Sequence, residues 1–114
     1  MNTLKNSVSL IGRLGNDPEI ISFDSGRMLA RFSIATNESY KDQSGEWKEK
    51  TNWHNIVTWG KSAELCKNLL KKGSELVLEG KLENDAFTTK EGDKRYVTQV
   101  NMREFLVLTK NNSK

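Results

Sequence analysis

Two tryptophans, Trp53 and Trp59, are the residues of this sequence whose placement most clearly indicates a chemical role. They lie within residues 51–61, TNWHNIVTWGK, which alternate with the two-residue period of a strand and so place both indoles on one face. His54 points to the other face. Such a face can be core, since strand aromatics are usually buried. Lys61 and further charges flank this one, however, and the combination favours an exposed stacking surface.

Two further aromatic residues, Tyr40 and Phe87, end other predicted strands, so four rings could line one concave surface. A nucleic-acid base stacked on such a ring contributes about 1 to 3 kcal/mol, with little sequence preference because every base has a π-face. Basic residues lie in or beside the loops that would border this surface, where they could meet phosphates. They are Lys41, Lys48, Lys50, Lys61, Lys94 and Arg95. The set predicts a groove for single strands.

Trp47 is a further candidate for the same surface. Residues 41–50, KDQSGEWKEK, mix both charges with Ser and Gly, which is typical of an exposed loop between hairpin strands. A tryptophan is unusual in such a loop. Because Trp47 is expected to be exposed and Lys48 follows it, we expect Trp47 to reach nucleic acid as well.

Two short motifs resemble phosphate-binding loops without completing them. Gly60, Lys61 and Ser62 stand between a strand and a helix as the P-loop requires, but its first glycine would fall at Asn55, within a predicted strand. Residues 12–15, GRLG, match the GxxG of a KH domain, but that loop joins two helices, whereas a strand precedes this one. We therefore expect neither nucleotide hydrolysis nor a KH domain.

Enzyme chemistry finds little support in the remaining reactive residues. A catalytic cysteine needs a base beside it, yet Cys66 lies on the apolar stripe of a predicted helix and His54 is expected to be packed and hydrogen-bonded. One cysteine cannot form an internal disulfide, and with one histidine it cannot complete a zinc site. Glu75, Glu79 and Glu83 alternate along a strand, where solvated ion pairing is the better interpretation. We predict no catalytic residue, no metal and no cofactor.

A scaffold of strands must position these side chains. Alternation predicts strands over residues 7–14, 28–40, 51–61, 75–87 and 95–108, with a shorter extended segment over 19–23. One helix follows the third strand, with Ser62 as candidate N-cap and Gly73 as its stop. The order predicts an all-β protein with one helix: an OB-fold, a five-stranded Greek-key barrel with the helix between strands 3 and 4. Gly12 and Gly80 lie mid-strand, where they would supply curvature.

Length and composition are compatible with this fold. The chain of 114 residues is long enough for one domain with a core that needs no disulfide or metal. No apolar run approaches the length of a membrane span, and residues 1–12 lack the apolar core of a secretory signal, so we expect a cytoplasmic protein. The net charge of +3 suits a polyanionic partner, but it is common among proteins that bind none.

The sequence resembles the bacterial single-stranded DNA-binding protein family. The most specific runs are LGNDPE, WHNIVTWGKSAE and LKKGSELVLEGKL, in that order, and FSIATNESYKD and GDKRY also match. The resemblance extends from residue 6 to about residue 108. It implies an OB-fold subunit, usually a homotetramer, with a homodimer as the alternative. Such a subunit coats single-stranded DNA in replication, recombination and repair without catalysing a reaction, and it is associated with the nucleoid.

The resemblance also assigns roles to single residues. It places the stacking aromatics at Tyr40, Trp53, Trp59 and Phe87, and His54 at a subunit interface. Together with the basic and loop residues, the predicted DNA-binding set is Tyr40, Trp53, Trp59, Phe87, Arg13, Lys41, Trp47, Lys48, Lys61 and Lys72.

Two departures from the family pattern carry expectations of their own. Between Leu82 and Phe87 the family often carries basic residues, whereas this chain has Glu83 and Asp85, which would repel phosphate and alter affinity or wrapping. The family's flexible linker and acidic C-terminal tip do not follow the domain. We therefore expect an OB-fold domain over residues 1–108 and a short disordered end over 109–114, with tail-mediated recruitment of replication partners in doubt.

Two other function classes remain as alternatives at this stage. An interaction protein could use the same barrel to hold protein partners and touch DNA weakly, and Glu83 and Asp85 in the expected DNA path favour it. A small OB-fold nuclease is the third hypothesis. It is disfavoured because no clustered Asp, Glu and Arg set with a metal-binding arrangement is evident.

Overall fold

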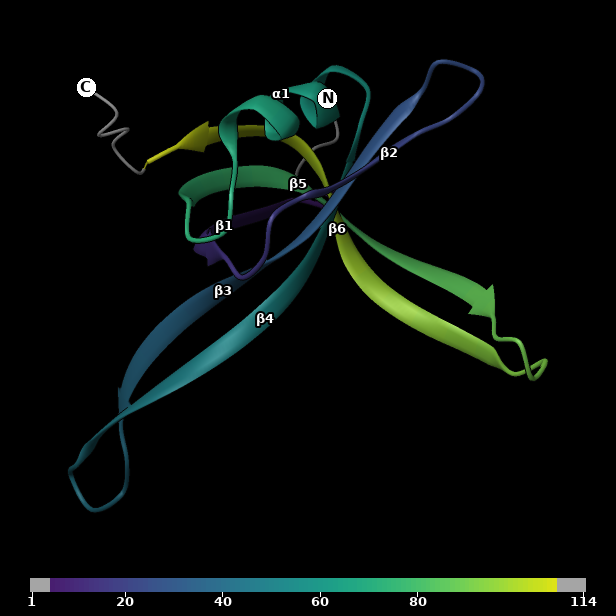
Figure 1. Cartoon of the computed structure of the whole chain (residues 1–114). Coiled ribbons are helices and arrows are strands. Elements are labelled where there is room, and N and C mark those ends of the chain that lie inside the picture. The colour runs from purple at the N-terminus through teal and green to yellow at the C-terminus, as the bar shows by residue number, and fades with distance from the viewer. Residues whose placement is uncertain (1–4, 109–114) are drawn as a thin grey trace.

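The computed structural model describes residues 5–108 of the chain, apart from the side chain of Phe87. Within these residues the order of elements is β1 (Val8–Leu14), β2 (Glu19–Ser22), β3 (Met28–Lys41), β4 (Trp47–Trp59), α1 (Lys61–Leu69), β5 (Glu75–Thr88) and β6 (Lys94–Val107) (Figure 1). The short end expected over residues 109–114 lies outside the described residues.

Five of these strands close into a barrel. Their order around the sheet is β1, β5, β6, β4 and β3, and pairing of Leu14 in β1 with Ile34 in β3 closes the ring. The neighbours are antiparallel except β4 and β6, which pair in parallel at Ile56 and Val100. The predicted all-β barrel of five strands with one helix is therefore confirmed.

The predicted position of the helix needs one correction. The short strand β2, expected only as an extended segment, pairs with β3 from Glu19 opposite Arg31 to Ser22 opposite Met28. It lies beside β3 at the end of the strand order, outside the closed ring. Counted with β2, the helix lies between β4 and β5 and not between strands 3 and 4.

The core fills the barrel because alternate side chains of each strand point inward. Its members are mainly aliphatic: Leu14, Ala30, Phe32, Ile34, Ile56, Leu76, Leu78, Val100 and Met102. Helix α1 adds Ala63 and Cys66, which are fully buried. The one buried threonine of β4, Thr58, donates its hydroxyl hydrogen to the Met102 carbonyl at 3.0 Å, so its burial leaves no polar group without a partner.

Helix α1 begins two residues earlier than the N-cap prediction implied. The first helical residue is Lys61, so the N-cap residue is Gly60 and not Ser62. Gly60 has a φ of 68°, which glycine adopts readily because it has no Cβ atom. The Ser62 hydroxyl instead donates to the Arg103 carbonyl at 3.5 Å. The helix ends at Leu69, and the N–H of Leu70 donates to the Cys66 carbonyl at 3.0 Å.

The loop predicted over residues 41–50 is shorter in the structure. β3 and β4 pair as far as Lys41 opposite Trp47, so Trp47 is a strand residue and only residues 42–46 form the turn. The Asp42 carboxylate accepts hydrogen bonds from the Glu46 N–H at 2.9 Å and from the Ser44 hydroxyl at 2.8 Å. These bonds, the Glu46 N–H first, lower the pKa of Asp42 and hold the turn closed.

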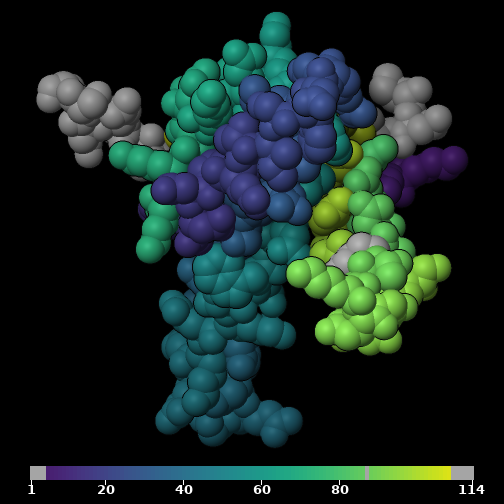
Figure 2. Space-filling model, turned by 45° about the vertical axis from the view of Figure 1, so that its right-hand side comes forward, coloured from purple at the N-terminus to yellow at the C-terminus, as the bar shows by residue number. Residues whose placement is uncertain are grey.

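Two long hairpins extend beyond the barrel as arms. The β3–β4 arm and the β5–β6 arm leave the barrel on the side away from α1 (Figure 1). In the space-filling view the two arms project from one body and stand apart, with an opening between them (Figure 2). The arms therefore form two walls around a space that the barrel itself does not fill.

The two mid-strand glycines are required by close contacts between strands. A Cβ atom on Gly12 would lie 2.5 Å from the Ala35 carbonyl oxygen, and one on Gly80 would collide with the Asn101 carbonyl oxygen. The β5–β6 register also shifts between Glu79 and Gly80, as at a β-bulge, which bends the strand. Both glycines thus permit the curvature that the sequence predicted.

Gly80→Ala should lower the free energy of unfolding by about 2 kcal/mol or more, because the new methyl group meets backbone that cannot move aside. Gly45→Ala is the matched control: its φ is 87° and no atom lies within 4 Å of its Cβ position, so about 1 kcal/mol of backbone strain is expected. Urea unfolding followed by tryptophan fluorescence measures both variants. A smaller loss for Gly80→Ala than for Gly45→Ala would contradict the close contact.

Candidate nucleic-acid interface

An open groove of about 610 Å³ lies between the β3–β4 and β5–β6 hairpins. One side is lined by polar residues of β3 and β4 and the β1–β2 turn, namely Asn16, Arg31, Ser33 and Asn55, with Val57 on the floor. The other side is lined by Asp85, Val97 and Gln99 of the β5–β6 arm. A groove with two strand walls and mixed polar and apolar lining suits an extended polymer better than a compact ligand.

Trp53 stands beside the groove with 61% of its surface exposed. Its ring packs on Gly15, where an added Cβ would lie 2.5 Å from the ζ3 carbon of the indole. The Gly15 N–H donates to the Ser33 carbonyl at 3.0 Å, which fixes this turn against β3. The turn therefore supports Trp53 from one side and leaves the rest of the ring to solvent.

Trp59 lies on the same strand face as Trp53, as the alternation predicted, but its surroundings differ. It is 37% exposed, and it stacks with Phe23 at 5.9 Å between ring centroids and 22° between planes. The guanidinium carbon of Arg27 lies 4.4 Å from the centroid of the Trp59 ring. The sequence reasoning identified residues 24–26 as a hairpin turn but missed the two residues that flank it, although an aromatic and an arginine on either side of a turn were a usable signal.

The β3–β4 arm carries the next two predicted aromatics. Trp47 is 70% exposed, and the ammonium of Lys41 lies 5.6 Å from its ring centroid. Lys48 pairs with two carboxylates of the turn, Asp42 at 3.9 Å and Glu46 at 3.7 Å. Its charge at the arm tip is therefore partly neutralised.

Tyr40 is exposed on this arm, but the register separates it from the tryptophans. It lies opposite Lys48, whereas Trp53 lies opposite Ala35. Alternate residues of one strand point to opposite faces, so Tyr40 belongs to the face opposite Trp53 and Trp59. The expectation that all four aromatic positions line one concave surface is therefore wrong for Tyr40.

The β5–β6 arm carries the fourth aromatic position. Phe87 lies opposite Arg95 in this ladder, and its side chain lies outside the described part of the chain. Tyr96, which the sequence reasoning did not select, is 72% exposed and lies opposite Ala86. Its place in the GDKRY run was the signal that could have found it.

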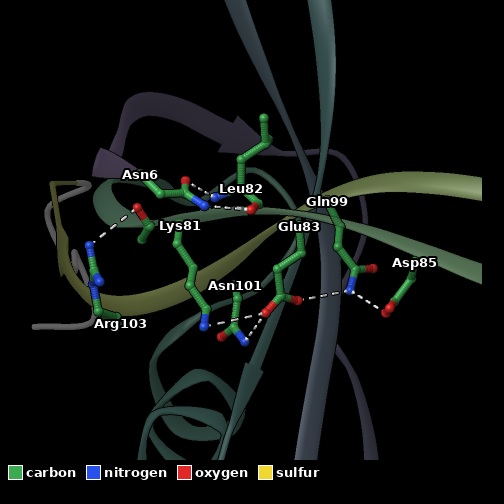
Figure 3. Close-up of polar contacts among 9 residues, drawn as sticks. Asn6, Lys81, Leu82, Glu83, Asp85, Gln99, Asn101 and Arg103 are labelled. Atoms are coloured by element: carbon green, nitrogen blue, oxygen red, sulfur yellow. Dashed lines mark hydrogen bonds and ion pairs between the residues drawn. The ribbon is translucent and has the colours of Figure 1, made fainter. Parts of the chain in front are cut away.

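The two acidic residues of this arm are held by amide side chains (Figure 3). Glu83 accepts hydrogen bonds from the Asn101 amide at 3.0 Å and the Gln99 amide at 3.5 Å, and the Lys81 ammonium lies 3.8 Å away. Asp85 accepts from the same Gln99 amide nitrogen at 3.2 Å. Lys81 is thus the described cationic partner of Glu83, and no ion pair is described for Asp85, so this arm keeps a negative character beside the groove.

Three predicted basic contacts lie away from the lining of the groove. Arg13 donates to the Gly73 carbonyl at 3.1 Å and pairs with Glu75 at 3.5 Å. Lys61 is the exposed first residue of α1, and Lys72 is exposed in the turn before β5. All three lie on the helix side of the barrel. A DNA strand would contact them only if it continued beyond the groove.

The two residues considered for catalysis, His54 and Cys66, are packed within the fold. His54 is half-buried, and its Nε2 lies 3.0 Å from the Thr36 hydroxyl, on the face opposite Trp53. Cys66 is fully buried in α1, and burial raises the pKa of its thiol to about 12. A thiol with this pKa stays protonated near neutral pH and is no nucleophile.

Among residues 5–108, no group of three or more His, Cys, Asp or Glu side chains is arranged to hold a metal ion. The described part of the chain also contains no helix with the length and apolar character needed to cross a membrane.

Comparison with known proteins places this geometry in context. Residues 5–108 match the model of the Single-strand binding protein family. Over 96 residues the chain is 47% identical to Single-stranded DNA-binding protein 1 of Chlorobaculum tepidum, covering 83% of this chain and 59% of that protein. The chain therefore spans less than two thirds of this relative.

Two solved structures have similar folds. One is the Plasmodium falciparum SSB in complex with single-stranded DNA, with a TM-score of 0.83 and 31% identity over 91% of this chain and 95% of the other. The second is a deletion mutant of the single-stranded DNA binding protein from Thermus aquaticus, with a TM-score of 0.80 and 30% identity over 91% of this chain and 50% of the other. This likeness confirms the OB-fold.

Proposed function

The chain belongs to the single-strand binding protein family, and from this premise we propose that it binds single-stranded DNA by stacking bases on exposed rings. The observation that carries the proposal is the pair of exposed indoles, Trp53 and Trp59, on the face of β4 that borders the groove. Stacking of this kind tolerates any sequence. The likeness to a structure that contains single-stranded DNA supports the same conclusion.

We assign the contacts in two groups. The stacking group is Trp53, Trp59, Trp47, Tyr40 and Phe87, of which Tyr40 contacts DNA only if the strand passes around the β3–β4 arm. The phosphate-contacting group is Arg13, Lys41, Lys48, Lys61 and Lys72. Their separation between the β3–β4 arm and the helix side of the barrel fits a DNA strand that wraps around the barrel.

The proposal places the protein with DNA in the cytoplasm, where it coats single strands during replication, recombination and repair without catalysis. The high pKa of the buried Cys66 thiol and the packing of His54 support a binding role. A second candidate function, the holding of protein partners with weak DNA contact, is favoured only by Asp85 in the groove wall and Glu83 beside it on β5.

Intrinsic tryptophan fluorescence should be strongly quenched by a thymidine homopolymer and little changed by duplex DNA. The reason is that only unpaired bases offer their faces to the exposed indoles. Affinity should fall as salt rises, since phosphate contacts release counterions. Weak quenching by both polymers at low salt would favour the protein-partner function, and Trp53→Ala, which should bind at least about fivefold more weakly, is the internal check.

The double variant Glu83→Gln and Asp85→Asn should bind the homopolymer more tightly than wild type at low salt. The substitutions remove the negative charge of Asp85 in the groove wall and that of Glu83 two residues before it on β5, and they keep the size of both side chains. The gain should shrink at high salt, where charges are screened. Glu91→Gln, which neutralises an exposed carboxylate in the turn between β5 and β6, is the matched control. A salt-independent gain, or none, would show that these carboxylates do not face phosphate.

We also propose that the chain self-associates into a tetramer, with a dimer as the alternative. An apolar row on the outer face of the barrel supports this: Ile11, Val77 and Leu106 are cross-strand neighbours on β1, β5 and β6, and Ile11 and Leu106 are well exposed. Such a row is costly to leave in water. His54, on the face away from Trp53, is the second proposed interface position.

Sedimentation velocity should give a mass of several chains for wild type and a smaller mass for Leu106→Glu, because a buried charge without a partner destabilises an interface. Lys90→Glu, on the exposed turn of the β5–β6 arm, serves as the charge control and should leave the mass unchanged. A wild-type protein that sediments as a single chain at micromolar concentration would refute the assembly, and an unchanged mass for His54→Glu would remove His54 from the interface.

A further inference from the structure

The turn between β2 and β3 places Phe23 and Arg27 against Trp59, where neither family resemblance nor sequence pattern assigned a role to them. Trp59 and Phe23 stack at 5.9 Å, and Arg27 lies over the indole at 4.4 Å. The turn itself is fixed by two hydrogen bonds, from the Phe23 N–H to the Arg27 carbonyl at 2.9 Å and from the Gly26 N–H to the Phe23 carbonyl at 2.9 Å. The backbone thus holds both side chains beside Trp59.

Arg27 is available for a further partner. Its side chain is exposed, and no ion pair is recorded for it among residues 5–108. A guanidinium is planar and weakly hydrated, so it can lie flat on an indole with one face and accept a stacked base on the other. Its N–H donors, which lie in the plane, remain free to reach a phosphate.

The position of this cluster continues the groove. Val57 on the groove floor and Trp59 are two residues apart on the same face of β4, which is about 7 Å along a strand. Leu29, the neighbour of Trp59 on β3, is followed two residues later by Arg31, which also lines the groove. A strand that leaves the groove at this end would therefore pass directly over the turn, which projects from the barrel on the side away from the arms (Figure 1).

We propose that Arg27, supported by Trp59 and Phe23, is itself a base-stacking residue that extends the binding surface onto the β2–β3 turn. This rests on the proposed binding of single-stranded DNA and adds a contact to it. In the stack, the Trp59 ring lies beneath the guanidinium and orients it. Trp59 is still 37% exposed, so the base on Arg27 is added to those that stack on Trp53 and on the exposed part of Trp59.

The test compares two oligomers of equal length, one of thymidine and one of abasic sites, which keep the phosphates and lack the bases. Arg27→Ala should lower affinity for the thymidine oligomer by about 5- to 150-fold, the range for one stacked base, and should affect the abasic oligomer much less. Arg27→Lys should behave like Arg27→Ala on thymidine, because an ammonium keeps the charge but has no planar face. Phe23→Ala should show a smaller loss with the same dependence on bases.

Lys67→Ala, which removes one exposed charge from α1, is the matched control and should bind both oligomers like wild type. Equal losses by Arg27→Ala on both oligomers, with full rescue by Arg27→Lys, would mean a phosphate contact and would overturn the stacking role. Unchanged or tighter binding by Arg27→Ala would mean that a base displaces the guanidinium, which also overturns it. If wild type binds neither oligomer, the proposed function itself fails, and this outcome is distinct from a failure of Arg27 alone.

Discussion

The unbroken pairing of β3 with β4 is the constraint on which the rest of the structure depends. The register runs from Leu29 opposite Trp59 to Lys41 opposite Trp47 without a shift. A shift of one residue would exchange the two faces of the ribbon. Ile56 and Thr58 would then leave the core, and Trp53 and Trp59 would enter it. The same pairing therefore sets the hydrophobic core and the aromatic surface, and neither can change without the other.

The sequence predicted the barrel well because alternation is a local property that survives in the fold. Strand boundaries were accurate where an apolar face was buried, as along β3 and β6. They failed at β4, whose first residues lie on an arm with no core side, so composition indicated a loop where Asp42 closes a tight turn. The prediction of Ser62 as N-cap was wrong because the chain turns at Gly60, whose positive φ starts the helix without a side-chain cap.

The candidate site was predictable only in part. The sequence shows which residues are aromatic, but it does not show which residues pack against each ring. Trp53 and Trp59 were found as a pair on one face, which the structure confirms. The residues that pack against these rings come from turns distant in sequence. Gly15 packs on Trp53, and Arg27 and Phe23 pack on Trp59. Tyr40 was misplaced because the hairpin register, which decides its face, is set by the turn at residues 42–46.

In the proposed binding mode, base stacking and phosphate contacts occur at separate places on the molecule. The lysines proposed for phosphates lie on the β3–β4 arm and near the two ends of α1, whereas the groove wall carries Asp85, with Glu83 and its partner Lys81 beside it. A DNA strand bound only through its phosphates would be repelled by the carboxylates of this wall. Base stacking on neutral rings is not opposed by these carboxylates. We therefore expect stacking to be the main attraction along the groove. For the proposed DNA complex, an arrangement with the bases in the groove and the phosphates at its outer edge would weaken the repulsion by these carboxylates without removing it.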